Sequence, residues 1–325
     1  INMPLGFDMN YEALQSYKGR NPKPSDFDSF WKKGIKEVQG IDPQVELVPA
    51  KFSANFAECF DLYFTGTGNA RVYAKYLRPK KSVSLSLNPA ILMFHGYSGS
   101  SGDWFDKLPY VAAGFSVAAL DCRGQGGKSI DVGGIKGNTL NGHIIRGLDD
   151  NPEKLLFRNI FLDTYQLARV ISEMPEIDKK RIGATGGSQG GGLTLACAGL
   201  VSWLNRAAPI FPFLCDYKRV WEMDLAKDGY NELRDYFKKF DPEHEREDEI
   251  FAKLGYIDVQ YLAPSIKCKI MMAVGLMDTI CPPSTQFAAY NKIKSKKELC
   301  IYKDFGHEGL PAINDKIFKY MCEML

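Results

Sequence analysis

One serine of the chain stands in a setting that suits nucleophilic catalysis. Ser188 lies in the turn Gly186-Gly187-Ser188-Gln189-Gly190, which has the pattern G-x-S-x-G. Glycines beside a serine allow strained backbone angles that hold its hydroxyl clear of the chain. The apolar residues before the turn predict a buried strand, and the Leu- and Ala-rich residues after it predict a helix. This context predicts a nucleophile at Ser188, whereas the bare pattern also occurs in ordinary glycine-rich turns.

A neutral serine hydroxyl needs a base to accept its proton. The chain contains four histidines, and only His307 both follows the serine in the chain and ends a late predicted strand. The other three lie in an H-G pair after an earlier strand, in a long loop and in a run of acidic and basic residues: His95, His143 and His244. We therefore predict that His307 is the base.

The base in turn needs an acid to orient its imidazole and stabilise the imidazolium. Asp278 follows the preceding predicted strand and completes the chain order Ser, Asp, His that suits a serine between a strand and a helix. Asp304 and Glu308 are competitors, but they are so close to His307 in the sequence that facing its Nδ1 atom would be awkward. The alternative role of Asp278 is to cap the helix that follows it. We favour Asp278 as the acid.

Negative charge that develops on the substrate oxygen requires two backbone N–H donors. We expect one from Gln189, the residue after the nucleophile, and the other from Tyr97, in the loop after the first core strand. Tyr97, Trp104 and Phe211 are also candidate walls of the substrate pocket, since all three follow strands near the serine. Such rings would admit an acetyl group and exclude longer acyl chains.

Two further polar residues follow the second core strand. Arg123 and Gln125 lie in Asp121-Cys-Arg-Gly-Gln125. Arg123 has no partner that the sequence identifies. It would either brace the loops around the site or bind an anionic part of the substrate, and bracing is the commoner role for an arginine in such a loop.

The elements needed to position these residues can be traced along the chain. Continuous apolar runs, typical of buried parallel strands, occur at residues 89–94, 115–120, 181–185, 206–211, 269–275 and 298–302. Alternating residues between 44 and 78 predict an antiparallel meander ahead of them. Helical patterns occur at 11–17, 27–38 and 313–325. A strand, a G-x-S-x-G turn and a helix within such a sheet predict the α/β-hydrolase fold.

The chain is expected to form a single domain over residues 1–325 with two insertions. Residues 126–159 are rich in Gly and Asn without periodicity, and long loops of this kind are usually functional or form interfaces. Residues 212–265 are charged and helical and lie between core strands, as a cap would.

Composition narrows the class of partner and the compartment. The formal net charge of +2 gives no electrostatic reason to expect nucleic acid or a membrane surface as a partner. No apolar run is long enough to span a bilayer, and residues 1–10 do not have the pattern of a signal peptide. The eight cysteines form no C-x-x-C pair and their spacing resembles no zinc or disulfide framework, so we expect reduced thiols in a cytoplasmic protein.

Several motifs together resemble one enzyme family. Arg123-Gly124-Gln125, Gly186-Gly187-Ser188-Gln189-Gly190 and His307-Glu308 are similar to the three signature motifs of the acetyl xylan esterase / cephalosporin C deacetylase group, carbohydrate esterase family 7. Residues 137–147, 275–278 and 281–285 match further stretches of that family, and the resemblance extends from residue 11 to the C-terminus. Phe211 departs from the pattern, because tyrosine is frequent at that position, and this affects fine substrate preference. Gly309 and Leu310 also depart from it, because proline and methionine usually follow the His-Glu pair.

The resemblance implies hydrolysis of acetyl esters on xylo-oligosaccharides and on the cephalosporin nucleus, without a metal or cofactor. It also implies a cytoplasmic homohexamer with active sites that face an internal cavity. A general short-chain carboxylesterase and a serine peptidase of the prolyl oligopeptidase type remain the alternatives. A non-catalytic binding protein of this fold would be expected to have lost Ser188, Asp278 or His307, and all three are present.

Overall fold

The computed structural model describes residues 8–80, 87–137 and 142–325. Part of the family-like stretch 137–147 therefore lies outside the described residues, as do the first seven of the residues that we searched for a signal peptide. None of the described helices is both long and apolar enough to cross a bilayer.

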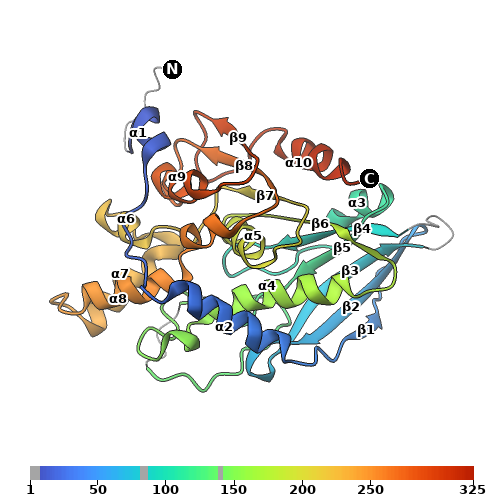
Figure 1. Ribbon diagram of the computed structural model, residues 1–325, viewed down its shortest axis with the longest axis horizontal. Coiled ribbons are helices and arrows are strands. Elements are labelled where there is room, and N and C mark those ends of the chain that lie inside the picture. Colours follow the sequence, from blue (N-terminus) through green and yellow to red (C-terminus); the bar gives the residue numbers. More distant parts are fainter. Residues whose placement is uncertain (1–7, 81–86, 138–141) are drawn as a thin grey trace.

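Within these residues the strands form one nine-stranded sheet in the order β1-β2-β3-β5-β4-β6-β7-β8-β9 (Figure 1). Their bounds are β1 Glu46–Pro49, β2 Ala57–Thr65, β3 Arg71–Pro79, β4 Asn88–Phe94, β5 Ser116–Leu120, β6 Ile177–Gly187, β7 Arg206–Ile210, β8 Lys269–Gly275 and β9 Lys297–Tyr302. The first three strands form the predicted antiparallel meander, and β3 also pairs antiparallel with β5. All pairs from β5 through β4 to β9 are parallel. The predicted α/β architecture is confirmed.

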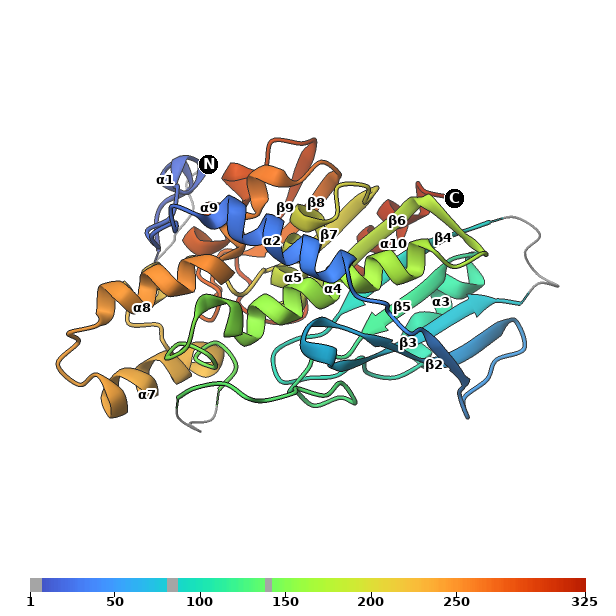
Figure 2. The same cartoon turned by 60° about the horizontal axis from the view of Figure 1, so that its bottom comes forward.

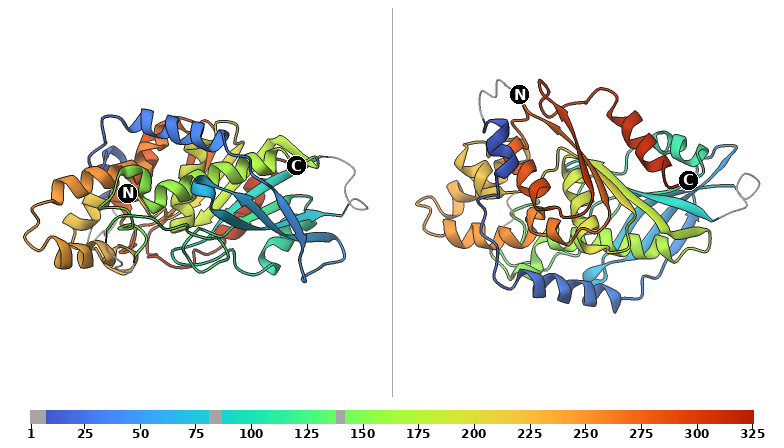
Figure 3. Two further views of the ribbon diagram at one scale, coloured as in Figure 1. Left: turned by 90° about the horizontal axis from the view of Figure 1, so that it is seen from below. Right: turned by 45° about the horizontal axis from the view of Figure 1, so that its top comes forward.

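Helices cover both faces of this sheet. On one face lie α2 (Phe27–Gln39), α4 (Leu156–Ser172), α5 (Gln189–Leu200) and α9 (Pro283–Lys292), and on the other lie α3 (Leu108–Ala112) and α10 (Ile313–Cys322). The right-hand view of Figure 3 shows the sheet between α2 and α4 on one side and α3 and α10 on the other. Helix α3 was not predicted from the sequence. The short helix α1 (Tyr11–Ser16) lies against α9.

The two faces form separate apolar cores because side chains alternate along a strand. In β8, Ile270, Met272 and Val274 belong to the core beneath α4 and α5. Met271 and Ala273 point the other way and pack with residues of α10. A strand that is buried on both faces reads as an unbroken apolar run, which is the pattern that identified these strands in the sequence.

The predicted helical insertion lies between β7 and β8. It contains α6 (Tyr217–Glu222), α7 (Asn231–Phe240) and α8 (Glu247–Leu254). Figures 1 and 2 show α7 and α8 at the end of the molecule away from the meander of β1 to β3. The segment that joins β5 to α4 runs towards the same region. Its described residues contain only one short helical turn, Pro152–Lys154.

Candidate active site

Ser188 occupies a sharp turn between the end of β6 and the start of α5. Its φ of 58° and ψ of −121° lie in a region that non-glycine residues rarely adopt. Its amide donates a hydrogen bond to the carbonyl of Ile210, 3.0 Å away, which holds the turn against β7. A Cβ atom at Gly190 would come within 2.1 Å of the carbonyl oxygen of Phe94. Glycine is therefore required where the helix passes so close to β4.

Three side chains from the carboxyl ends of β6, β8 and β9 form one hydrogen-bonded chain. The Nε2 atom of His307 lies 2.9 Å from the Oγ atom of Ser188, and its Nδ1 atom lies 2.9 Å from Oδ2 of Asp278. The carboxylate of Asp278 is fully buried, whereas the imidazole is 15% exposed. This arrangement can pass the serine proton to the imidazole while the aspartate fixes the orientation of the ring.

Asp278 does not cap α9, because the N-cap of that helix is Pro282 and no side chain caps it; its carboxylate bonds the loop before the helix and faces His307. Its Oδ1 atom accepts hydrogen bonds from the amides of Ile280 and Cys281, at 2.9 and 2.8 Å. Its Oδ2 atom faces His307 and also accepts from the side chain of Gln286, 3.3 Å away. One oxygen therefore fixes the loop before α9, and the other is left to orient the imidazole.

The competing carboxylates do not reach the imidazole. Asp304 is exposed, and Glu308 accepts a hydrogen bond from the amide of Gly306 at 3.0 Å. His95 also has a different task. Its Nδ1 atom contacts the carbonyl of Gly96 at 2.7 Å, and its Nε2 atom accepts from the amide of Cys122 at 3.0 Å. The ring therefore ties together the loops that follow β4 and β5.

The two expected oxyanion donors come from neighbouring strands. Phe94 of β4 pairs with Gly186 of β6, so the loop after β4 lies beside the serine turn. Gln189 is the first residue of α5, and its N–H has no acceptor within the helix. Tyr97 is a central residue of the turn closed by the hydrogen bond from Gly99 to Gly96, at 3.1 Å, so the turn itself leaves its N–H unused.

Arg123 braces the site from within the fold. Its Nε and Nη2 atoms donate to the two carboxylate oxygens of Asp163 on α4, at 2.7 and 2.5 Å, and Nη1 donates to the carbonyl of Thr67 at 3.0 Å. Both charged side chains are almost fully buried. Gln125 acts closer to the serine, because its amide exchanges hydrogen bonds with that of Gln189 at 2.9 and 3.0 Å.

The three aromatic residues expected around the pocket lie in different places. The ring of Phe211 lies 4.5 Å from the imidazole of His307. Tyr97 contacts Phe213, whose amide donates to the carbonyl of Ser188 at 3.0 Å. Trp104 is the exception, because its ring stacks on that of Phe52, with 6.1 Å between the ring centroids.

The interpretation of Trp104 as a pocket wall needs correction for that reason. The indole packs in a small apolar cluster with residues of β2, β3 and β5. Shielding these apolar side chains from water outweighs any attraction towards the polar turn beside Ser188. The structure therefore does not bring Trp104 to the triad.

Sequence reasoning missed two residues that contact the loop after β4. Glu232 of α7 accepts a short hydrogen bond from the hydroxyl of Tyr97. The Nε2 atom of His143 lies 2.9 Å from Oγ of Ser98. Nothing local in the sequence marks either contact, since both join distant segments.

A model of the acetyl xylan esterase family matches residues 3–324. The chain belongs to the acetyl xylan esterase family. The crystal structure of acetyl xylan esterase 1 from Thermoanaerobacterium sp. JW/SL YS485 is 56% identical in sequence, has a TM-score of 0.96, and is matched over 98% of this chain and 99% of that one. Acetyl xylan esterase from Paenibacillus sp. R4 is 34% identical, with a TM-score of 0.91 and coverage of 98% and 100%. Acetyl esterase Axe7A of Xylanibacter ruminicola is 26% identical over 318 residues, or 93% of this chain and 69% of that protein.

These likenesses establish the class of enzyme. The esterase is a carboxylic ester hydrolase of the kind that hydrolyses acetyl esters. They also confirm the α/β-hydrolase fold that the serine turn and the strand pattern predicted.

One side-chain group of the esterase has the composition of a metal site. Ligand atoms of Asp278, Cys281 and His307 lie within 4.8 Å of one another. Two of the three are already joined to each other by a hydrogen bond. Burial raises the pKa of the Cys281 thiol well above its usual value, so this sulfur stays protonated and binds metal weakly at neutral pH. The geometry therefore favours the hydrogen-bonded relay over an ion.

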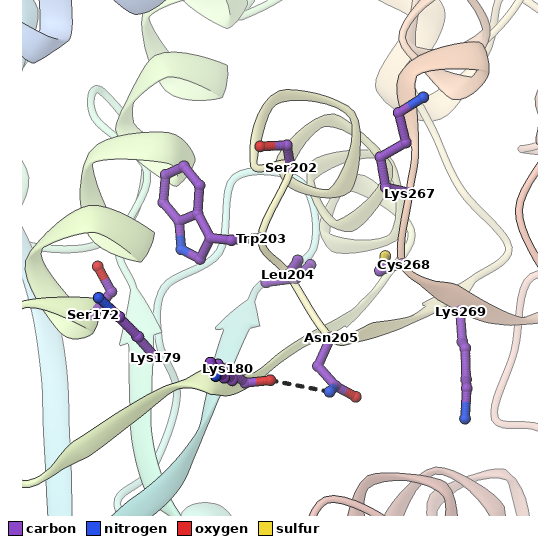
Figure 4. A pocket seen from close by; sticks show the side chains of 10 residues that line it. All are labelled: Ser172, Lys179, Lys180, Ser202, Trp203, Leu204, Asn205, Lys267, Cys268 and Lys269. Atoms are coloured by element: carbon purple, nitrogen blue, oxygen red, sulfur yellow. Dashed lines mark hydrogen bonds between the residues drawn. The ribbon is translucent and has the colours of Figure 1, made fainter.

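A surface pocket of about 600 Å³ lies at the amino ends of the sheet strands, opposite to the ends that carry the triad (Figure 4). Lysines from the amino ends of β6 and β8 border it, around the indole of Trp203. Figure 4 shows Lys267 and Lys269 extending in opposite directions, so their ammonium groups do not converge on a shared point. This pocket is remote from Ser188, which follows the carboxyl end of β6.

Proposed function

We propose that the esterase removes acetyl groups from acetylated xylo-oligosaccharides and related small acetyl esters, including cephalosporin C, through an acetyl-enzyme on Ser188. The observation that carries the mechanism is the continuous hydrogen-bonded chain from Ser188 through His307 to Asp278. The substrate class rests on membership of the acetyl xylan esterase family and on the resemblance of the signature motifs.

In the first half of the reaction, the Oγ atom of Ser188 attacks the acetyl carbonyl carbon while Nε2 of His307 takes its proton. The carbonyl oxygen becomes an oxyanion, which the backbone N–H groups of Gln189 and Tyr97 stabilise. Collapse of the tetrahedral intermediate breaks the bond to the sugar oxygen. That oxygen leaves with the proton held by His307, and the acetyl group remains on the serine.

Water completes the cycle. His307 takes a proton from the water molecule that attacks the acetyl-enzyme, and the same two N–H groups stabilise the second oxyanion. Release of acetate returns the proton to Ser188. Throughout, the buried carboxylate of Asp278 holds the imidazole by its Nδ1 atom and stabilises the imidazolium without taking the proton itself.

Preference for acetyl groups follows from the rings beside the triad. The aromatic ring of Phe211 lies against His307, and Tyr97 and Phe213 contact each other beside the serine turn. These rings are attached to segments that end sheet strands, so a longer acyl chain has to displace a supported side chain. Steric exclusion of this kind discriminates more strongly than the ~1–3 kcal/mol that burial of one methylene supplies.

The proposal is tested by measuring acetate release from an acetylated xylo-oligosaccharide, cephalosporin C and p-nitrophenyl acetate, with p-nitrophenyl butyrate and a peptide p-nitroanilide as comparisons. We expect rapid, Ser188-dependent release from the acetyl esters and no cleavage of the anilide. Rapid acid quenching followed by mass spectrometry should detect one acetyl group on the peptide that contains Ser188. Faster cleavage of the butyrate or of the anilide would favour a general carboxylesterase or a peptidase instead.

We also propose that the esterase is a closed homo-oligomer, most simply a hexamer, in the cytoplasm. The segment 126–159 is long for a connection between a strand and a helix, which suits a role in subunit contacts. All eight cysteines are free thiols, as expected in a reducing compartment. Light scattering at micromolar concentration tests the assembly, and a monomeric mass would refute it.

A further inference from the structure

Glu232 belongs to the helical insertion, and its carboxyl group reaches the loop after β4. It is the second residue of α7 and is 6% exposed. One carboxylate oxygen accepts from the hydroxyl of Tyr97, and the other accepts from the amide of Ile145 at 3.0 Å. A Cβ atom at Gly142 would come within 2.2 Å of the same carboxylate. The loop at 142–145 therefore encloses the carboxyl group.

Burying this acid is costly, because no lysine or arginine of the described residues forms an ion pair with it. Burial raises the pKa of Glu232 to about 7, against the effect of the hydrogen bonds that it accepts. An apolar side chain would fill the space without this penalty. The hydrogen bonds that the carboxyl group accepts offset part of the cost of its burial. Their donors lie in the loop after β4 and in the segment beside it.

Tyr97 is held from two sides through its hydroxyl group. It donates to Glu232 and accepts from the amide of His143 at 3.2 Å. The imidazole of His143 in turn contacts Ser98, the neighbour of Tyr97 in the same turn, at 2.9 Å. The turn from Gly96 to Gly99 is thus fixed at its tip by an acid from α7 and by a loop that precedes α4.

We propose that Glu232 is a positioning residue for acetyl transfer, because it fixes the ring of Tyr97 and so aims the backbone N–H of Tyr97 at the oxyanion. The inference rests on the proposed function, in which that N–H stabilises the transition state. Glu232 touches neither the serine nor the imidazole. It affects the reaction only through the turn after β4. Through this residue, the helical insertion helps to position a group that stabilises the oxyanion.

The variants Glu232→Gln and Tyr97→Phe test this inference, singly and together. Tyr97→Phe removes the hydroxyl that donates to Glu232. Glu232→Gln leaves one acceptor oxygen for two donors, the Tyr97 hydroxyl and the Ile145 amide, and nearly preserves the volume. We expect kcat for p-nitrophenyl acetate to fall about 10- to 100-fold in each single variant, as small misplacements of reacting groups do, with KM changed less than about threefold. Because both changes disturb the same link, kcat of the double variant should be reduced by no more than in the more impaired single variant. The two reductions in kcat should not multiply.

A second readout addresses the oxyanion site directly. A small alkylboronic acid forms a tetrahedral adduct with an active serine, and its affinity should fall by the same factor as kcat/KM in both variants. Asp235→Asn is the matched control, since Asp235 lies on the same helix and bonds only to Asn231 among the described residues. It should leave kcat and boronate affinity unchanged.

The results distinguish failure of the positioning role of Glu232 from failure of the proposed function. Unchanged kcat in both variants, a rise in KM alone, or losses that multiply in the double variant would overturn the positioning role. If Glu232→Gln fails to fold, Tyr97→Phe still decides, because it removes a single oxygen atom. Absence of Ser188-dependent acetate release from the wild-type enzyme would instead refute the proposed function, and the inference with it.

Discussion

The loss of stability on removing Arg123 from its buried ion pair with Asp163 can be calculated from the protonation of Asp163. Replacing Arg123 with Met removes both N–H donors that bind the carboxylate and leaves Asp163 buried without its cation. Burial already raises the pKa of Asp163 above its usual value, and the charge of Arg123 opposes that shift. In the variant the carboxyl group is therefore expected to take up a proton rather than remain charged.

The cost then depends on pH. Holding the proton in the folded state costs about 1.4 kcal/mol for each pH unit above the unfolded pKa of about 3.9. At pH 7.5 this amounts to about 5 kcal/mol, the upper end of the range measured when one partner of a buried ion pair is removed. At pH 5 it amounts to about 1.5 kcal/mol. The folded variant binds more protons than the unfolded chain in this window, so its stability rises as the pH falls.

Urea unfolding of Arg123→Met and of the wild type, at pH 5 and 7.5 and at one protein concentration, measures this difference. The double variant Arg123→Met/Asp163→Leu lacks the titrating group, so its stability relative to wild type should change little with pH. Arg20→Met is a matched surface control. The Arg20 side chain is 60% exposed and pairs with Glu222, and its loss should cost less than about 1 kcal/mol at either pH. An equal penalty for Arg123→Met at both pH values would refute the reasoning.

Three further expectations follow from the site and the core. Ser188→Ala and His307→Ala should each lower kcat by about 10⁴-fold or more with folding intact, and Asp278→Asn by somewhat less, measured with p-nitrophenyl acetate; if Asp304→Asn is damaging and Asp278→Asn is not, the acid is misassigned. The value of kcat/KM should fall steeply from acetyl to butyryl p-nitrophenyl esters and be negligible for octanoyl, and a flat profile would exclude a tight acyl pocket beside Phe211. Burial and the nearby charge of Asp216 raise the pKa of Asp258 to about 7, so the folded state holds a proton that the unfolded chain releases near pH ~4. The stability that this group contributes is thus lost as the pH rises through that window. The melting temperature of Asp258→Asn should therefore rise relative to that of the wild type between pH 4.5 and 7.5. A difference in melting temperature that stays constant with pH would contradict the raised pKa.

The catalytic residues could be predicted because their signals are local. Ser188, Asp278 and His307 each follow an apolar strand, and parallel strands bring their carboxyl ends to one edge of a sheet. The topology alone therefore brings them near one another. Their catalytic roles stay predictions, but the structure places the three side chains within hydrogen-bonding distance.

Side-chain direction in loops was not predictable in the same way. Trp104 follows a core strand as Tyr97 does, yet its ring turns towards Phe52 on the meander side. Which way a loop side chain points depends on the apolar surface available around it, and this surface is built by segments distant in the sequence. Helix α3 was missed for a related reason. Its five residues, with a proline in the first turn, are too few to show a helical period.

Partners of buried polar groups were the largest omission. Tyr97 and Glu232 are separated by 135 positions, and Arg123 and Asp163 by 40. Neither acid belongs to a motif. Asp163 did carry a signal, since it lies among apolar residues of a helix face that is buried, where an acid requires a counter-charge. Glu232, at the start of a charged helix, carried none.

The lysine-bordered pocket at the amino ends of the strands has a practical consequence for immobilising this enzyme. Lys179 and Lys180 of β6 and Lys269 of β8 have exposed side chains, and Lys267 lies beside them. The triad lies past the carboxyl ends of the same strands, and the seven residues of β8 alone span about 23 Å. An aldehyde-activated support that couples through these amines would attach the protein at the amino ends of its strands, with Ser188 turned away from the support.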